Sequence, residues 1–292
     1  MAVHKRTYRG YSGGLTPAWS RFLILHRQGS RGLFRSRFLT IFLVACFFPP
    51  LVMILAAYLS HNAILQPFLK APNKPLISID ASFFLLFLQI QGAFAYVLTA
   101  FLGPGLIAPD LSNGALPLYL CRPFSRTEYI LGKMSVLFVA LSEITWIPGL
   151  ILFFIEASLD GSKWMWDNLW IAGAVVAGSL IWILVLSLIA LAMSAWVRWR
   201  LAAGALILGV FFIGAGLHGA IAGILRSDYG VLVNPVALIV MVYKDLLGLL
   251  TVSTSGAQLG PSIEDACVAL AAMCGICLIL LARKIRAVQV VK

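Results

Sequence analysis

The sequence predicts an all-α membrane protein with six transmembrane helices, on three observations. Hydrophobic residues occupy 61% of the 292 positions and charged residues only 11%, whereas an average soluble chain is roughly 25% charged. Six continuous apolar runs reach the length of about 20 residues that crosses roughly 30 Å of hydrocarbon. None of them shows the alternation over about ten residues that marks the strands of a membrane β-barrel, so we expect helices.

The six expected spans are separated by polar segments or by segments that contain glycine and proline. They are residues 38–60, 83–108, 134–157, 168–197, 201–225 and 263–282. We divide the chain accordingly into a basic segment (1–37), a transmembrane domain (38–283) and a short tail (284–292). An even number of spans places both termini on one side of the membrane.

The charge distribution orients this bundle. Most of the 22 basic residues lie before the first span, in the 109–133 loop, at 198–200 and in the tail, whereas most of the 11 acidic residues lie in the other connections. Because Lys and Arg are retained on the cytoplasmic side of short loops, both termini and the 109–133 loop are predicted to be cytoplasmic. The net charge of +11 follows from this asymmetry, so we do not expect nucleic-acid binding.

The basic segment 1–37 is predicted to lie on the membrane surface. Aromatic and leucine side chains alternate there with arginines at four-residue spacing from Arg27 to Arg35, which is typical of an amphipathic helix in contact with lipid headgroups. The alternative is a disordered basic leader, because Gly29 and Gly32 weaken a helix. No cleavage-site pattern follows the segment, so it does not resemble a secretory signal.

The 109–133 loop carries definite structural signals. The Gly-Pro-Gly sequence at 103–105 is expected to kink the second span as it ends, and Asp110 is a helix-start signal. The sequence "SRTE" from Ser125 to Glu128 is a capping box that predicts the start of the third span. The loop is therefore predicted to contain a short helix, a break and a new helix start.

The loop sequence "LIAPDLSNGALPLYLCRPFSRTEYILGK" resembles the cytoplasmic loop of ABC-2 type transporter permeases. In that family an acid, a Gly, an apolar run, an Arg-Pro, a Ser-Arg and a Gly-Lys follow one another. The resemblance implies that this loop holds the coupling helix, which docks on a partner ATPase. The positions that match are Asp110, Gly114, Leu116, Leu118, Leu120, Arg122, Pro123, Ser125, Arg126, Tyr129, Gly132 and Lys133.

The same resemblance implies several further properties. The chain is expected to be the membrane subunit of an exporter in the bacterial cytoplasmic membrane, where two permease copies, identical or related, enclose the pathway. It also implies that segment 226–262 forms a re-entrant or interfacial helical hairpin on the outer side. The alternative there is a seventh span, which would move the basic C-terminal tail outside, against the charge rule.

Nucleotide chemistry is expected in a separate subunit. A phosphate-binding P-loop needs Gly, four residues and then Gly-Lys-Ser/Thr. The nearest match ends in Gly132-Lys133-Met134 and has Thr127 in place of the first Gly. ATP and Mg²⁺ are therefore assigned to the partner ATPase, and we expect no cofactor, metal site or catalytic residue in this chain. The "CGIC" sequence at 274–277 lies in an apolar span, where small cysteines are typical packing residues.

Three intramembrane polar residues are candidates for the transport pathway. Gln89 and Tyr96 share one face of the second span, where helix–helix hydrogen bonding is the alternative. Glu143 in the third span would cost about 2.5–3.5 kcal/mol facing lipid, so it is expected to face the bundle, in a transport or a structural role. Two other classes of function stay open, an ion-coupled carrier that uses Glu143 and a membrane-embedded enzyme.

Overall fold

The structure of the chain is a computed structural model. It describes residues 17, 20, 22–34, 36–62, 70–71, 74–75, 78–115, 125–197, 199–226, 228–250 and 260–285. Within these ranges the chain is helical, apart from turns and one short antiparallel ladder. That ladder pairs β1 (Lys70–Ala71) with β2 (Lys74–Pro75).

Six helical segments are long and apolar enough to cross a membrane. They are Arg37–His61, Ala81–Ser112, Arg126–Asp160, Leu169–Trp196, Arg200–Leu225 and Ile263–Lys284. Each contains or closely matches one of the apolar runs found in the sequence, so the prediction of six such helices is confirmed. The described part of the chain therefore fits a multi-pass membrane protein.

The first three of these segments are each interrupted once. The first consists of α2 (Arg37–Ala45) and α3 (Phe48–His61), the second of α5 (Ala81–Leu102) and α6 (Pro104–Ser112), and the third of α8 (Arg126–Ile144) and α9 (Trp146–Asp160). A proline follows each break within four residues: Pro49, Pro104 and Pro148. Because proline lacks an amide hydrogen and its ring clashes with the preceding turn, it explains why the helices break at these places.

Each of the remaining helices is a single element without a break. They are α1 (Phe22–Phe34), α10 (Ser162–Asp167), α11 (Leu169–Trp196), α12 (Arg200–Leu225), the 3₁₀ helix η2 (Asp228–Val233), α13 (Pro235–Leu246) and α14 (Ile263–Lys284). The 12 residues of α13 extend about 18 Å, which is too short to cross the hydrocarbon. A re-entrant segment is one that enters and leaves the membrane on the same side, and the helices alone do not define where the membrane lies. The re-entrant path predicted for 226–262 therefore stays a prediction.

Helix α11 forms the centre of the bundle. In its most apolar stretch 72% of the residues are buried inside the protein, against 17% in α12 and 22% in α14. It packs against α5, α6, α8 and α9 as well as against α12, α13 and α14. Large exposed side chains along α12 after its first residue, such as Phe212 and Ile213, are apolar, as expected of a surface that faces lipid or another apolar chain.

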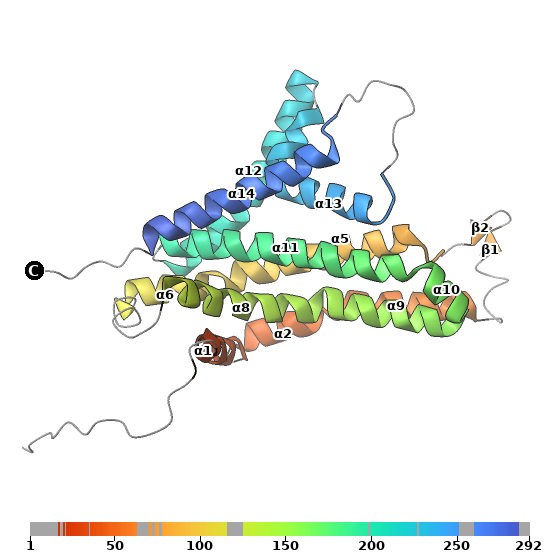
Figure 1. The fold of residues 1–292 in the computed structure, drawn as a ribbon, viewed down its shortest axis with the longest axis horizontal. Coiled ribbons are helices and arrows are strands. Elements are labelled where there is room, and N and C mark those ends of the chain that lie inside the picture. The colour runs from red at the N-terminus through yellow and green to blue at the C-terminus, as the bar shows by residue number, and fades with distance from the viewer. Residues whose placement is uncertain are drawn as a thin grey trace, which may run out of the picture.

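The bundle has two distinct ends (Figure 1). We call one the α6 end, where α6 lies, α2, α8 and α12 begin and α11 and α14 finish. The other is the α10 end, where α3 and α9 finish, α5 and α11 begin and α10 lies. Figure 1 shows α1 nearly end-on at the α6 end, so this helix runs across the long helices rather than along them.

Helix α1 is packed tightly on α8. A Cβ atom added at Gly29 would lie 2.7 Å from Val136 Cγ2, so glycine is what allows this approach. Leu25 is buried, and His26 Nδ1 lies 3.2 Å from Ser135 Oγ. Residues 22–34 are thus an ordered helix rather than a disordered leader, while the predicted position of α1 on a membrane surface stays a prediction.

Candidate functional site at the α6 end

An acid, a lysine and a tyrosine meet where the second and third long helical segments approach each other. Asp110 lies near the end of α6, and Tyr129 and Lys133, four residues apart, lie on one face of α8. Asp110 Oδ2 lies 2.8 Å from Lys133 Nζ and accepts a hydrogen bond of 2.7 Å from the Tyr129 hydroxyl. The three residues thus join α6 to α8 at the base of the loop that connects them.

This contact is largely shielded from solvent. The Lys133 side chain is 11% exposed, that of Asp110 is 16% exposed, and Tyr129 is fully buried. Removing one partner from a buried, hydrogen-bonded ion pair is strongly destabilising, because the other charge is left without compensation. The contact is therefore expected to fix the spacing of α6 and α8.

Helix α6 is also bonded to α11. A helix start leaves backbone amides without intrahelical partners, and α6 starts afresh after the break at Gly103. Ser194 of α11 contacts the backbone of the first turns of α6: its Oγ accepts from the amides of Ile107 at 3.2 Å and Ala108 at 3.0 Å, and it lies 3.4 Å from the Pro104 carbonyl oxygen. A displacement of α6 is therefore opposed by both α8 and α11.

Helix α8 begins with the predicted capping box. The Ser125 amide donates a 2.6 Å hydrogen bond to Glu128 Oε2, and the Glu128 amide donates a 3.2 Å hydrogen bond to Ser125 Oγ. These reciprocal bonds satisfy two amides at the helix start. They fix the point at which the chain enters α8 after the loop, and they confirm the capping box predicted from "SRTE".

A cavity of about 240 Å³ lies beside the Asp110–Lys133 pair. Gln28 and Gly29 of α1 form one wall, and Gly105 of α6 and Arg200 of α12 contribute to the others. The lining therefore combines the paired charges with one further cation from Arg200. Its location places α1, α6, α8 and α12 around one polar space at the α6 end.

The structure brings together only some of the predicted coupling-loop residues. Asp110, Tyr129 and Lys133 form the contact described above, whereas Arg126 is exposed on the first turn of α8. Gly114 is exposed and has a φ of +64°, a left-handed conformation that suits glycine in the turn after α6. The other predicted positions, Leu116, Leu118, Leu120, Arg122 and Pro123, lie outside the described residues.

Gln89 and Tyr96, the first two candidate pathway residues, do line a common space. They border a cavity of about 350 Å³ between α5, α11 and α13, together with Trp182 and Tyr243. The Tyr96 hydroxyl donates a 3.1 Å hydrogen bond to the Leu208 carbonyl oxygen of α12. The cavity is therefore mostly aromatic and aliphatic, with a few polar groups at its wall.

Glu143, the third candidate pathway residue, lies elsewhere. It is half-buried on α8 and borders a small cavity of about 40 Å³ with His26 and Ser30 of α1 and Thr40 of α2. In the described part of the chain no side chain forms an ion pair with it. The structure thus separates Glu143 from Gln89 and Tyr96, although sequence reasoning grouped the three.

Sequence reasoning missed a polar contact within the bundle. Pro50 has no amide hydrogen to donate to the carbonyl oxygen of Cys46, four residues earlier. The buried Gln91 side chain of α5 donates a 3.1 Å hydrogen bond to that oxygen instead. The Pro49-Pro50 pair signals in the sequence that a carbonyl is free, but nothing local identifies the residue that satisfies it.

Comparison with known proteins assigns no family to the chain, so its function has to be inferred from these residues. No protein-family model matches the chain, and no curated protein matches it significantly. The features of the chain that bear on its function are therefore the loop pattern, the six long apolar helices and the contacts that hold the ends of the loop.

Proposed function

We propose that the chain is the permease subunit of an ABC-2 type exporter in a bacterial cytoplasmic membrane, with both termini cytoplasmic. In this proposal a second permease copy completes the pathway, and a separate ATPase, which binds ATP and Mg²⁺, docks on the 109–133 loop. The observation that supports it best is the contact of Asp110 with Tyr129 and Lys133, because it closes the base of that loop.

Because the Asp110–Lys133 contact ties the two ends of the loop together, the loop can pass a mechanical force from the ATPase to the helices. A force applied by the ATPase to the loop acts on α6 and α8 together, because the Asp110–Lys133 distance is only 2.8 Å. The bonds from Ser194 pass the displacement on to α11. The second, third and fourth long helical segments would then move as one unit when the ATPase closes.

The structure suggests a division of labour within the loop. Asp110 bonds to Lys133 and Tyr129 of its own chain, which favours a role in transmission over direct contact with the ATPase. Arg126 is exposed at the start of α8, so it is the better candidate for a docking contact. Docking and transmission are therefore expected to respond to different substitutions.

Co-expression of the chain with candidate ATPases would test this division. Recovery of the complex is measured by affinity pull-down, and coupled turnover is measured as ATP hydrolysis in liposomes. Arg126→Ala is expected to lower recovery of the ATPase. Lys133→Met leaves Asp110 without its buried partner and is expected to lower the amount of folded chain. Per folded chain, it is expected to leave recovery of the ATPase close to wild type and to lower coupled turnover, because α6 and α8 lose their buried charge contact.

The control is Lys70→Ala, at the α10 end, which is expected to change neither quantity. Wild-type recovery and wild-type turnover in both the Arg126 and Lys133 variants would contradict the coupling role of the loop. If the folded Lys133 variant lost both recovery of the ATPase and coupled turnover, docking and transmission would not be separable.

A transport measurement in the same liposomes, with and without the ATPase, addresses the carrier alternative. An ion-coupled carrier transports without an ATPase and depends on Glu143, so Glu143→Gln would abolish transport that needs no ATP. The exporter proposal expects transport to require the ATPase. It also expects Glu143→Gln to affect transport less than Lys133→Met, because Glu143 lies outside the Gln89–Tyr96 cavity.

A further inference from the structure

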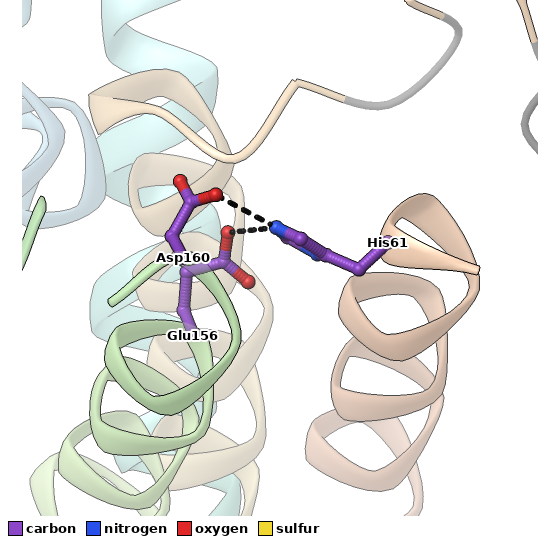
Figure 2. Close-up of side chains that lie close together, drawn as sticks. All are labelled: His61, Glu156 and Asp160. Atoms are coloured by element: carbon purple, nitrogen blue, oxygen red, sulfur yellow. Dashed lines mark hydrogen bonds and ion pairs between the residues drawn. The ribbon is translucent and has the colours of Figure 1, made fainter. Parts of the chain in front are cut away.

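A histidine and two carboxylates converge at the α10 end, far from the loop just described. His61 is the last residue of α3, and Glu156 and Asp160 lie one turn apart near the end of α9. Figure 2 shows both carboxylates directed from α9 toward the imidazole ring of His61. We propose that His61, Glu156 and Asp160 form a binding site for a divalent transition-metal ion such as Zn²⁺.

The distances suit such a site. His61 Nε2 lies 3.1 Å from Asp160 Oδ1 and 3.6 Å from Glu156 Oε1, and one donor atom from each residue lies within 4.8 Å of the other two. Neighbouring ligands of a tetrahedral Zn²⁺ ion are about 3.3–3.6 Å apart, given metal–ligand bonds of about 2.0–2.2 Å. Only a small closing movement would give all three residues metal–ligand distances.

The imidazole is oriented as a metal ligand should be. His61 Nδ1 lies 3.0 Å from the carbonyl oxygen of Ala57 and 3.1 Å from Ser60 Oγ, which donates its own hydrogen to the same carbonyl oxygen, so both neighbours can accept a proton carried by Nδ1. Metal-binding histidines commonly donate their second ring N–H to a carbonyl group in this way. Nε2 then directs its lone pair at two carboxylates, and such an arrangement requires a cation between them.

The burial of Glu156 favours a metal ion over a proton as that cation. Glu156 is 1% exposed, and within the described residues its Oε2 atom is buried without a hydrogen-bond partner. A proton on Nε2 can hydrogen-bond Asp160 Oδ1, at 3.1 Å, but Glu156 Oε1, at 3.6 Å, lies beyond hydrogen-bond distance, so one proton leaves the Glu156 carboxylate without a hydrogen bond from the imidazole. A metal ion can be coordinated by both carboxylates and the imidazole together.

The donor set indicates which ions are suitable. One imidazole nitrogen and two carboxylates suit Zn²⁺ and its neighbours, whereas Mg²⁺ and Ca²⁺ prefer six or more oxygen ligands. The His61 side chain is 26% exposed and that of Asp160 is 42% exposed, so the ion can enter and water can complete its coordination. The bound ion would join α3 to α9 at the α10 end. The site does not depend on the proposed transport function.

The test is metal binding by the purified chain, prepared with an affinity tag that contains no histidine. The protein in detergent is stripped with a chelator, desalted, and mixed with increasing Zn²⁺ or, in parallel, Mg²⁺. Bound metal is counted by mass spectrometry after a second desalting step. We expect one Zn²⁺ per chain, a melting temperature that rises with Zn²⁺, and no retained Mg²⁺.

Three ligand variants and one control make the test specific. His61→Gln, Glu156→Gln and Asp160→Asn are each expected to weaken Zn²⁺ binding by at least about tenfold, since even supporting residues cost that much. Asp167→Asn changes an exposed acid on neighbouring α10 and should bind Zn²⁺ as wild type does. Asp160 is exposed, so its variant remains informative should the buried Glu156 variant fail to fold.

Wild-type Zn²⁺ binding in the folded ligand variants would overturn the proposal. It would mean that the ion binds elsewhere, for example at the cysteines of α14, and that His61 forms an ordinary ion pair with the two carboxylates. Equal retention of Mg²⁺ and Zn²⁺ by the wild-type chain would likewise contradict a transition-metal site.

Discussion

Single side chains in this protein complete hydrogen bonds that the helices leave open. Gln91 donates to the carbonyl oxygen of Cys46, which Pro50 leaves without a helical partner, and Ser194 of α11 bonds to the backbone amides of Ile107 and Ala108 in α6. An unsatisfied backbone group inside a bundle costs free energy, because no water is present to replace the missing partner. Residues of this kind hold the interrupted helices in place.

Gln91→Met is expected to destabilise the chain by about 1–2 kcal/mol, because the Cys46 carbonyl oxygen loses its donor while the side-chain volume is kept. Unfolding in mixed micelles is followed with a dye that reacts with thiols, since Cys46 and Cys277 are buried in the folded chain. Gln89→Met is the matched control, because no side-chain hydrogen bond of Gln89 is found in the described part of the protein. Equal stability of the two variants would show that the Gln91 bond contributes nothing.

Asp80 at the start of α5 provides a test of pH dependence. Partial burial by itself raises its pKa, but hydrogen bonds from the Ser82 hydroxyl, the amides of Phe83 and Ser82, and the Ser78 hydroxyl outweigh this and lower the pKa below its usual 3.8. A lowered pKa in the folded chain means that the carboxylate contributes stability above pH 3.8. That contribution is lost as the pH falls through the lower folded value.

Asp80→Ala should therefore destabilise the chain by about 1 kcal/mol at neutral pH, the usual cost of losing a helix cap. The difference from wild type should shrink as the pH falls below about 4. Unfolding midpoints of the two proteins across this range provide the measurement. A difference that stays constant down to the lowest pH would mean that the ionised carboxylate is not the stabilising group.

At the scale of helices, close packing depends on glycine at particular positions. A Cβ atom added at Gly103, the break between α5 and α6, would lie 2.7 Å from Ala190 Cβ and 2.9 Å from the Thr99 carbonyl oxygen. Neither neighbour is a flexible side-chain end. This glycine therefore lets the break lie directly against α11.

Gly103→Ala is expected to destabilise the chain by about 1–3 kcal/mol, because α6 must move away from α11. Gly173→Ala, within α11, places its methyl group where no atom lies within 4 Å, and it should be neutral or slightly stabilising. Unfolding midpoints of the two variants distinguish these outcomes. If the Gly103 variant were as stable as the Gly173 variant, the close approach would not limit packing.

Local signals in the sequence predicted the helices well and the contacts between distant helices poorly. The six apolar runs and the Ser125–Glu128 capping box depend on neighbouring residues, and both predictions are confirmed. His61 and Asp160 are 99 positions apart, so no spacing in the sequence indicates that they meet. Sequence reasoning therefore did not consider these residues together, and it grouped Glu143 with Gln89 and Tyr96 because it could not place the faces of two different helices.

At the scale of the whole molecule, the two ends of the bundle differ in chemistry. Asp110, Lys133 and Arg200 lie at the α6 end, whereas His61, Glu156 and Asp160 lie at the α10 end. The charge rule predicts that the α6 end is cytoplasmic and the α10 end external. The coupling loop and the proposed metal site would then lie on opposite sides of the membrane.

Accessibility labelling in whole cells tests this orientation. In a background without reactive native cysteines, cysteines placed at position 120 and near both termini should react only after the membrane is permeabilised. Cysteines at positions 70 and 245 should react with an impermeant reagent in intact cells. Labelling of position 120 in intact cells would contradict the predicted topology.

The burial of α11 has a consequence for biosynthesis. The first three long helical segments, up to Asp160, are made before the helix against which α5, α6, α8 and α9 pack. A nascent chain that has reached residue 160 can insert these segments and already contains contacts between them, such as that of Asp110 with Lys133, but the faces that pack on α11 have no partner until Trp196 has left the ribosome. The complete bundle can therefore assemble only after the fourth segment, and the contacts among the first three segments must hold them together in the membrane until it arrives.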